Sequence, residues 1–128
     1  MTLKTTKVVY WVSTGLLALF ILPGIFFMNS PIAQEGIRHM QIPAWLGTTV
    51  GIGQFIGGLI LIIPKLPIRL KEWGYTALGI VYMSAFIGHI VLDGFGRDTI
   101  TAMVMFAVLV ISYLSYHKVY GYDRDVTV

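Results

Sequence analysis

The chain has no cysteine and few charged residues. With no cysteine among its 128 residues, it can form neither a disulfide nor a thiolate-ligated metal site. Charged residues make up 12% of the chain, against about 25% in an ordinary soluble domain. Hydrophobic residues reach 56% and the mean hydropathy is +0.79, so there is too little polar surface to cover a globule. These values exclude a disulfide-rich secreted module and a disordered chain, and they predict a small integral membrane protein.

Four apolar runs are long enough to cross a bilayer, whose hydrocarbon core needs about 20 helical residues. Because every backbone polar group must be satisfied within the lipid, runs of this length form helices. We therefore predict an all-α fold, an antiparallel four-helix bundle in which residues 1–128 form a single membrane domain. The first run is too long for the apolar core of a signal peptide, and we expect Pro23-Gly24 to kink it. The predicted spans are residues 8–28, 44–63, 73–92 and 99–117.

Most basic residues fall on one side of these predicted spans, and only Arg38 and Arg97 fall on the other. The positive-inside rule then predicts cytoplasmic N and C termini. A basic rim of this kind favours anionic lipid headgroups, so we expect membrane lipid and no nucleic acid as a partner. The rim consists of Lys4, Lys7, Lys65, Arg69, Lys71, Lys118 and Arg124.

The second predicted span carries small residues on one face. Gly47, Gly51 and Gly58 lie within a narrow arc of that helix, and Gln54 shares it. Glycines allow membrane helices to approach closely, so we expect this face to serve helix packing. Gln54 would then point inward, where it either hydrogen-bonds a neighbouring helix or orients a ligand.

The third predicted span has the residues best suited to chemistry. Its His89 and Asp93 are four residues apart, so the carboxylate can accept a hydrogen bond from the imidazole. Ionisable groups at membrane depth are often functional, although the same pair is also consistent with a capped helix end. We take His89 and Asp93 as candidate catalytic residues. The candidate ligand-binding residues are Gln54, Tyr82, Phe86, His89 and Asp93.

The sequence predicts no metal site. His39 and His89 could approach each other, but two histidines with scattered carboxylates are a weak metal signal. Haem b would need a second histidine at membrane depth facing His89, and the sequence offers none. Asp98 is expected to be the N-cap of the fourth helix.

Several short motifs occur together in this chain: Tyr10 to Leu17 (YWVSTGLL), Ile63-Pro64-Lys65, Lys71 to Tyr75 (KEWGY) and Gly88-His89. In these motifs the chain, over roughly residues 7–116, resembles the DoxX-like family of small four-span membrane proteins. The resemblance implies an antiparallel four-helix membrane bundle, found mostly in bacteria, and so we expect the protein in a bacterial inner membrane. Some named relatives are linked to quinone-coupled sulfur oxidation, or to membrane complexes involved in thiol and oxidative stress.

These observations favour a small binding or accessory protein that holds a lipid-like or quinone-like molecule in its bundle or docks on a larger membrane complex. An alternative is a subunit of a quinone-linked oxidoreductase in which His89 exchanges a proton. A small transporter is the third alternative, although alternating access is usually built on an inverted repeat, which these four spans lack. Quinone or lipid is the expected cofactor class. Either a membrane-protein partner or a second copy of this chain would be the protein partner.

Overall fold

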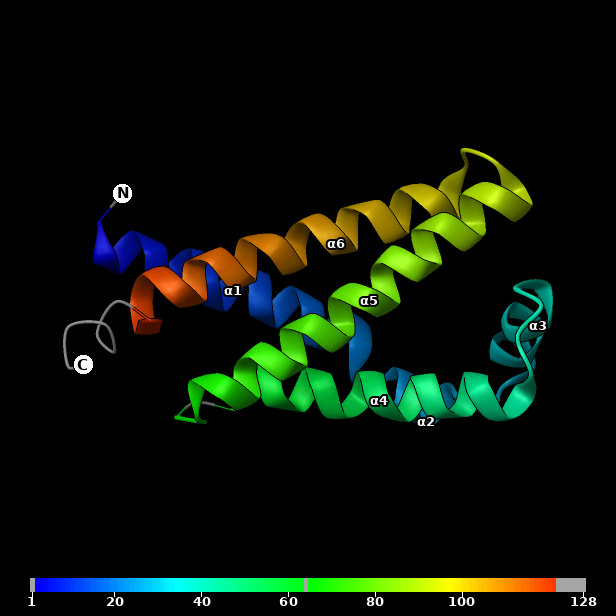
Figure 1. Cartoon of the computed structure of the whole chain (residues 1–128), viewed down its shortest axis with the longest axis horizontal. Helices are drawn as coiled ribbons and strands as arrows, with labels where there is room; N and C mark the ends of the chain where they lie inside the picture. Colours follow the sequence, from blue (N-terminus) through cyan, green and yellow to red (C-terminus); the bar gives the residue numbers. More distant parts are fainter. Residues whose placement is uncertain (1, 64, 122–128) are drawn as a thin grey trace.

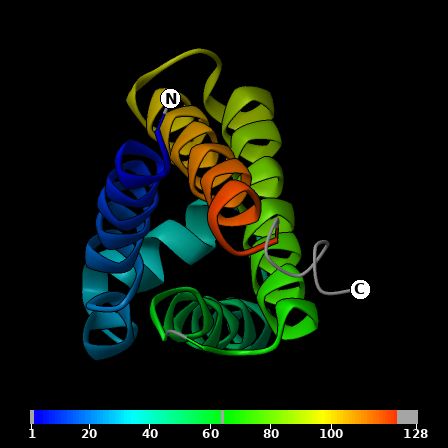
Figure 2. The same cartoon turned by 90° about the vertical axis from the view of Figure 1, so that its left-hand side faces the viewer.

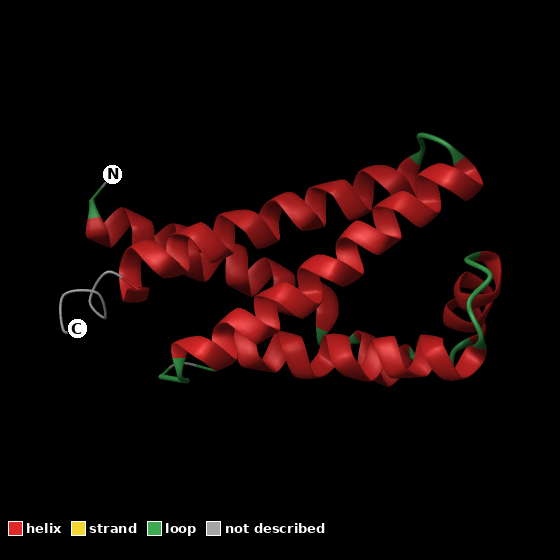
Figure 3. Ribbon diagram, viewed as in Figure 1, coloured by secondary structure: helices red, strands yellow, loops and turns green. Residues whose placement is uncertain are grey.

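The computed structural model describes residues 2–63 and 65–121, which are helical except for short connections (Figure 3). No strand occurs within these ranges. The elements are α1 (Leu3–Ile21), α2 (Gly24–Phe27), α3 (Pro31–His39), α4 (Ala44–Ile62), α5 (Ile68–Asp93), α6 (Arg97–Tyr116) and a closing π-helical turn, η1 (His117–Gly121).

The four long helices form a closed ring in the order α1, α4, α5, α6, in which α6 packs back on α1 (Figures 1 and 2). One end of the bundle, here called the terminal end, contains the start of α1, the α4–α5 connection and η1. The opposite, distal end contains α3 and the α5–α6 turn. The ribbons of α4 and α5 meet at the terminal end and diverge toward the distal end, where α3 stands across the ends of both (Figure 1).

Four segments are long and apolar enough to span a membrane, which confirms the predicted all-α four-helix membrane bundle. They are Leu3–Phe27, Ala44–Ile62, Ile68–Asp93 and Arg97–Val119. The orientation of the termini stays a prediction. Two residues used in the sequence analysis, Pro64 and Arg124, lie outside the described ranges.

Two helix boundaries differ from the prediction. The third span begins at Ile68 and not at residue 73, so Lys71 and Glu72 belong to the helix and not to a loop. The prediction that Asp98 is the N-cap of the fourth helix is wrong. Gly96 occupies the cap, and Asp98 lies in the first turn, where its negative charge is still favourable against the helix dipole.

The connection between the first two spans contains a helix that the hydropathy pattern did not reveal. Ser30 caps α3 by accepting a hydrogen bond from the Ala33 backbone N–H at 3.2 Å, and Pro31 occupies the first helical position. This cap and proline are typical of a helix start. None of the residues in α3 is buried, so α3 is a surface helix that bridges two spans.

Buried side chains are concentrated toward the terminal end. The cluster combines tyrosines with aliphatic residues, including Leu17, Leu61 and Leu78, each at most 1% exposed. By contrast, residues 44–56 of α4 and residues 83–93 of α5 include no buried residue. Burial in α4 and α5 is therefore confined to the part nearer the terminal end, whereas α6 also buries Thr99 and Ala102 at the distal end.

Candidate functional site

A hydrogen-bonded network lies inside the terminal half of the bundle. The Ser112 hydroxyl of α6 is 2.7 Å from the Thr14 hydroxyl of α1 and 2.6 Å from the Tyr75 hydroxyl of α5. Thr14 and Ser112 are completely buried. Because buried hydroxyl groups cost free energy unless they are paired, this contact fixes the register of three helices against one another.

Lys71 is buried beside this network, with 2% of its surface exposed. Its ammonium group donates a hydrogen bond to the Leu61 carbonyl at the end of α4, at 2.8 Å, and the Tyr10 hydroxyl donates to the same carbonyl at 3.2 Å. The Lys71 nitrogen also lies 5.8 Å from the centre of the Tyr116 ring, within reach of a cation–π interaction. Lys71 forms no ion pair among the described residues. Its ammonium group is instead stabilised by the Leu61 carbonyl and by the Tyr116 ring.

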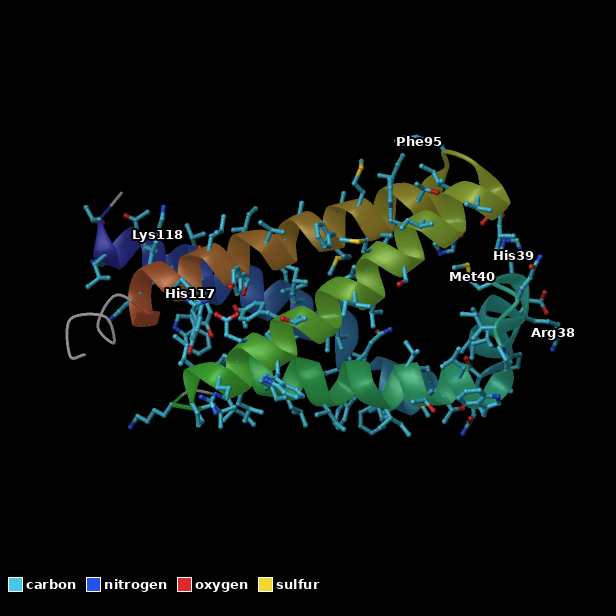
Figure 4. The ribbon with its side chains drawn as sticks, viewed as in Figure 1. Arg38, His39, Met40, Phe95, His117 and Lys118 are labelled. Carbon is cyan, nitrogen blue, oxygen red and sulfur yellow. The ribbon has the colours of Figure 1, made fainter. Side chains whose placement is uncertain are left out.

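A second polar group lies at the rim of the terminal end. The Tyr113 hydroxyl of α6 donates to the Glu72 carboxylate, with oxygen–oxygen distances of 3.0 and 3.2 Å. The His117 Nε2 atom contacts the same carboxylate, off the axis of a hydrogen bond. His117 also packs edge-on against the Tyr113 ring. Figure 4 shows His117 at this end of the molecule, close to the start of α5.

An apolar groove, here called the α5–α6 groove, extends from this rim between α5 and α6. It consists of two hollows of about 210 Å³ each, which share Phe106. Tyr75 and Tyr113 line the hollow nearer the terminal end, and Phe86 lines the other. The full lining is Tyr75, Thr76, Gly79, Met83, Phe86, Met103, Phe106, Leu109, Val110 and Tyr113.

At the distal end one carboxylate joins two histidines. Asp93, the last residue of α5, lies 2.6 Å from Nε2 of His39 through Oδ1, and 3.3 Å from Nδ1 of His89 through Oδ2. The expected contact between His89 and Asp93 is thus present. His39 joins it from 54 positions away in the sequence, and Figure 4 shows this residue at the end of α3 that faces α5.

Local structure explains how His39 reaches Asp93. The helix α3 ends in a tight turn in which Gln41 takes a left-handed conformation, with φ of 61°, and the Ile42 N–H donates to the Ile37 carbonyl. This is the hydrogen-bond pattern of a Schellman cap. Met40, the residue before Gln41, packs its side chain over the bare backbone of Gly88 on α5. These features bring the carboxyl end of α3 against the carboxyl end of α5.

The sequence pattern of the DoxX-like family matches residues 12–112. The chain belongs to the DoxX-like family. No curated protein and no solved structure matches it. The matched range covers α2 to α5 completely, together with about half of α1 and most of α6.

The structure distributes the predicted ligand-binding residues of this DoxX-like protein over different places. Phe86 lines the α5–α6 groove. Tyr82, only 5% exposed, faces the core, and its hydroxyl makes no hydrogen bond to any described residue. Gln54 is half-buried and has no hydrogen-bond partner within the described ranges. His89 and Asp93 lie together at the distal end.

The glycines of α4 lie against neighbouring side chains. A Cβ atom added to Gly47 would be 2.6 Å from the Ile37 side chain, and one added to Gly51 would be 2.8 Å from the Met28 sulfur. At Gly58 the nearest atom is on Leu22, at 3.1 Å. The predicted packing face of α4 therefore contacts α1 and the segment from Met28 to Ile37.

Sequence reasoning missed three features of this DoxX-like protein. Lys71 was counted with the basic rim, although KEWGY continues directly into the apolar run and could have been read as helix. His39 was considered only as a possible neighbour of His89, and no local pattern indicates its contact with Asp93. The α5–α6 groove is formed by two helices, so no single stretch of sequence reveals it.

Proposed function

We propose that this DoxX-like protein binds a quinone-like amphiphile, with its apolar tail in the α5–α6 groove and its ring near Tyr75, Thr76 and Tyr113. The observation that carries the proposal is the groove itself, an apolar channel with aromatic side chains along its length and a polar rim at one end. Ligand sites in proteins combine such apolar walls with a few oriented polar groups.

Side chains at the terminal end of the groove suit a ring that carries carbonyl groups. The Tyr75 and Tyr113 rings meet edge-to-face with their centres 5.2 Å apart, and aromatic rings accept a further ring in offset or edge-on contact. Thr76 is exposed to the groove, and its hydroxyl has no hydrogen-bond partner among the described residues. It is therefore a free donor for a ligand carbonyl.

Native mass spectrometry of the protein in lipid nanodiscs tests this proposal, first as extracted and then after addition of ubiquinone. We expect about one quinone per chain. Gly79→Leu should abolish retention, because Gly79 lines the groove and a Cβ there meets only ordinary contacts, the nearest to Leu109 at 3.7 Å. The larger side chain would therefore fill the groove without disrupting the bundle.

Gly53→Leu is the matched control. Gly53 lies on α4, and a Cβ atom added to it meets nothing within 4 Å, so quinone retention should match the unmodified protein. Thr76→Val should weaken ubiquinone binding about fivefold, as expected for the loss of one hydrogen bond. Retention of phospholipid alone, or equal quinone retention in the Gly79 and Gly53 variants, would overturn the proposal.

A second candidate function is a subunit of a quinone-linked oxidoreductase, in which His89 exchanges a proton with a quinone at the distal end. The contact of His89 with Asp93, one turn beyond the Phe86 hollow, favours it. Quinone-dependent electron transfer by the protein in its native membrane should then be lost in His89→Ala and kept in His117→Ala. Equal activity in the two variants would remove His89 from the reaction.

A further inference from the structure

Four side chains with metal-ligating atoms meet at the distal end, and they come from three helices. His39 ends α3, His89 and Asp93 lie in the last turns of α5, and Asp98 lies in the first turn of α6. One ligand atom each from His89, Asp93 and Asp98 lies within 4.8 Å of the others. Imidazole and carboxylate together are a donor set typical of borderline divalent metals.

The α5–α6 turn brings Asp98 to this place. Gly94 adopts φ of 73°, a left-handed conformation that favours glycine. The Thr99 hydroxyl then donates to the Gly94 carbonyl at 2.8 Å, and Thr99 is almost completely buried. The turn is therefore anchored, and the start of α6 is held beside the end of α5.

We propose that the distal cluster is a binding site for a divalent transition-metal ion of the Zn²⁺ class, ligated by His89, Asp93 and Asp98. Zn²⁺ sits about 2.0–2.2 Å from nitrogen and oxygen ligands, so two ligands at tetrahedral angles are roughly 3.3–3.6 Å apart. The distance from His89 Nδ1 to Asp93 Oδ2 is 3.3 Å in the structure. These two atoms thus already have the separation that such an ion requires.

His39 supports the site as a positioning residue. It contacts Oδ1 of Asp93, whereas His89 lies against Oδ2. With its Nε2–H donating to Oδ1, His39 orients the carboxylate and leaves Oδ2 free to ligate. Hydrogen-bonding partners of this kind commonly change metal affinity by 10- to 100-fold.

Charge and exposure are consistent with an exchangeable ion. Two aspartates balance the charge of a divalent cation, and a neutral histidine adds a softer nitrogen donor. The side chain of Asp93 is 32% exposed and that of His89 is 19% exposed, so an ion could enter from the surface and keep a water in its fourth position. Bound metal would tie α5 to α6 and, through His39, to α3. The sequence alone predicted no metal at this place.

Titration of the metal-free full-length protein with Zn²⁺ tests the site. The protein is held in nanodiscs of zwitterionic lipid, which lack anionic headgroups, and binding is measured by isothermal titration calorimetry. We expect one ion per chain. The affinity should fall at least tenfold in His89→Gln and in Asp98→Asn, and about tenfold in His39→Gln. The Asp98 side chain has no hydrogen bond among the described residues, so this variant should keep the bundle intact, as circular dichroism would show.

His117→Gln is the matched control, because His117 also contacts a carboxylate but lies at the terminal end. It should bind Zn²⁺ with unchanged affinity. The proposal is overturned if the unmodified protein takes up no Zn²⁺, if the folded Asp98→Asn variant binds it equally well, or if His117→Gln loses as much affinity as His89→Gln. None of the metal ligands lines the α5–α6 groove, so quinone retention and Zn²⁺ binding can fail independently.

Discussion

The polar side chains at the two ends of this bundle differ in their burial and in their hydrogen-bond partners. At the terminal end buried polar side chains form hydrogen bonds inside the bundle. The Ser112 hydroxyl contacts two other hydroxyls, and Lys71 donates to a backbone carbonyl. At the distal end His39 and His89 share the partly exposed carboxylate of Asp93, although Thr99 is buried there and bonds the Gly94 carbonyl. The first arrangement stabilises the fold, and the second leaves donor atoms accessible.

This difference follows from what drives association in a membrane. Lipid is as apolar as leucine, so helices are held by close packing and by hydrogen bonds between them. The terminal half has both, through Gly57, Gly74 and the Ser112 network. The distal half holds its surface helix α3 through Ile37, Met40 and His39. The terminal half therefore joins its spans to one another through buried contacts, whereas the distal contacts hold a surface helix.

The largest expected effect on stability comes from a larger side chain at Gly57, in the terminal half of the bundle. A Cβ atom at Gly57 would be 3.1 Å from the buried Leu78 side chain, whereas one at Gly53 would meet nothing within 4 Å. We expect Gly57→Leu to lower the free energy of unfolding by about 1–3 kcal/mol and Gly53→Leu to leave it unchanged. Denaturation of the protein in mild detergent measures both. Equal stability of the two variants would contradict close packing of Gly57 against Leu78.

Loss of the shared hydroxyl should have a smaller effect. Ser112→Ala removes the partner of Thr14 and Tyr75, and hydrogen bonds between membrane helices contribute about 1 kcal/mol. The same detergent denaturation should show a loss of this size. Ser84→Ala is the control, since Ser84 is exposed and makes no hydrogen bond within the described ranges; a similar loss there would contradict a special role for the network.

Breaking the distal contact should scarcely alter overall stability and should loosen α3. Asp93→Asn, studied without metal, removes the carboxylate that His39 and His89 share. Exposed ion pairs contribute about 0–1 kcal/mol, so amide hydrogen exchange in α3 should rise by up to about fivefold. Asp98→Asn should leave that exchange rate unchanged. No change in Asp93→Asn would mean that Met40 and Ile37 hold α3 by themselves.

The four-span orientation, which places the two ends of the bundle on opposite sides of the membrane, can be tested by labelling single cysteines. Since the chain has no cysteine, Gly36→Cys in α3 and Arg69→Cys at the start of α5 each provide a single thiol. Gly36 has open space around it. An impermeant thiol reagent should reach Gly36→Cys from outside intact cells and Arg69→Cys only after lysis. Labelling of both from one side would contradict the four-span orientation.

Much of the fold could be predicted because its signals are local. Hydropathy over about 20 residues located the four spans, and the i, i+4 spacing of His89 and Asp93 predicted a contact that the structure contains. Boundaries were less accurate, because Lys71 and Glu72 look like loop residues when only their charge is considered. The helix α3 was missed, although Ser30 and Pro31 are a recognisable start signal.

The sequence by itself determined that this chain is a helical membrane bundle, since its apolar runs are long enough to cross a bilayer and their backbone groups must be hydrogen-bonded within each helix. Only the tertiary structure decided which polar groups meet. The contact of His39 with Asp93 depends on α3 folding back across the distal end, and the α5–α6 groove depends on how two helices cross. These are distances between residues far apart along the chain, and they are fixed by packing that no local pattern encodes.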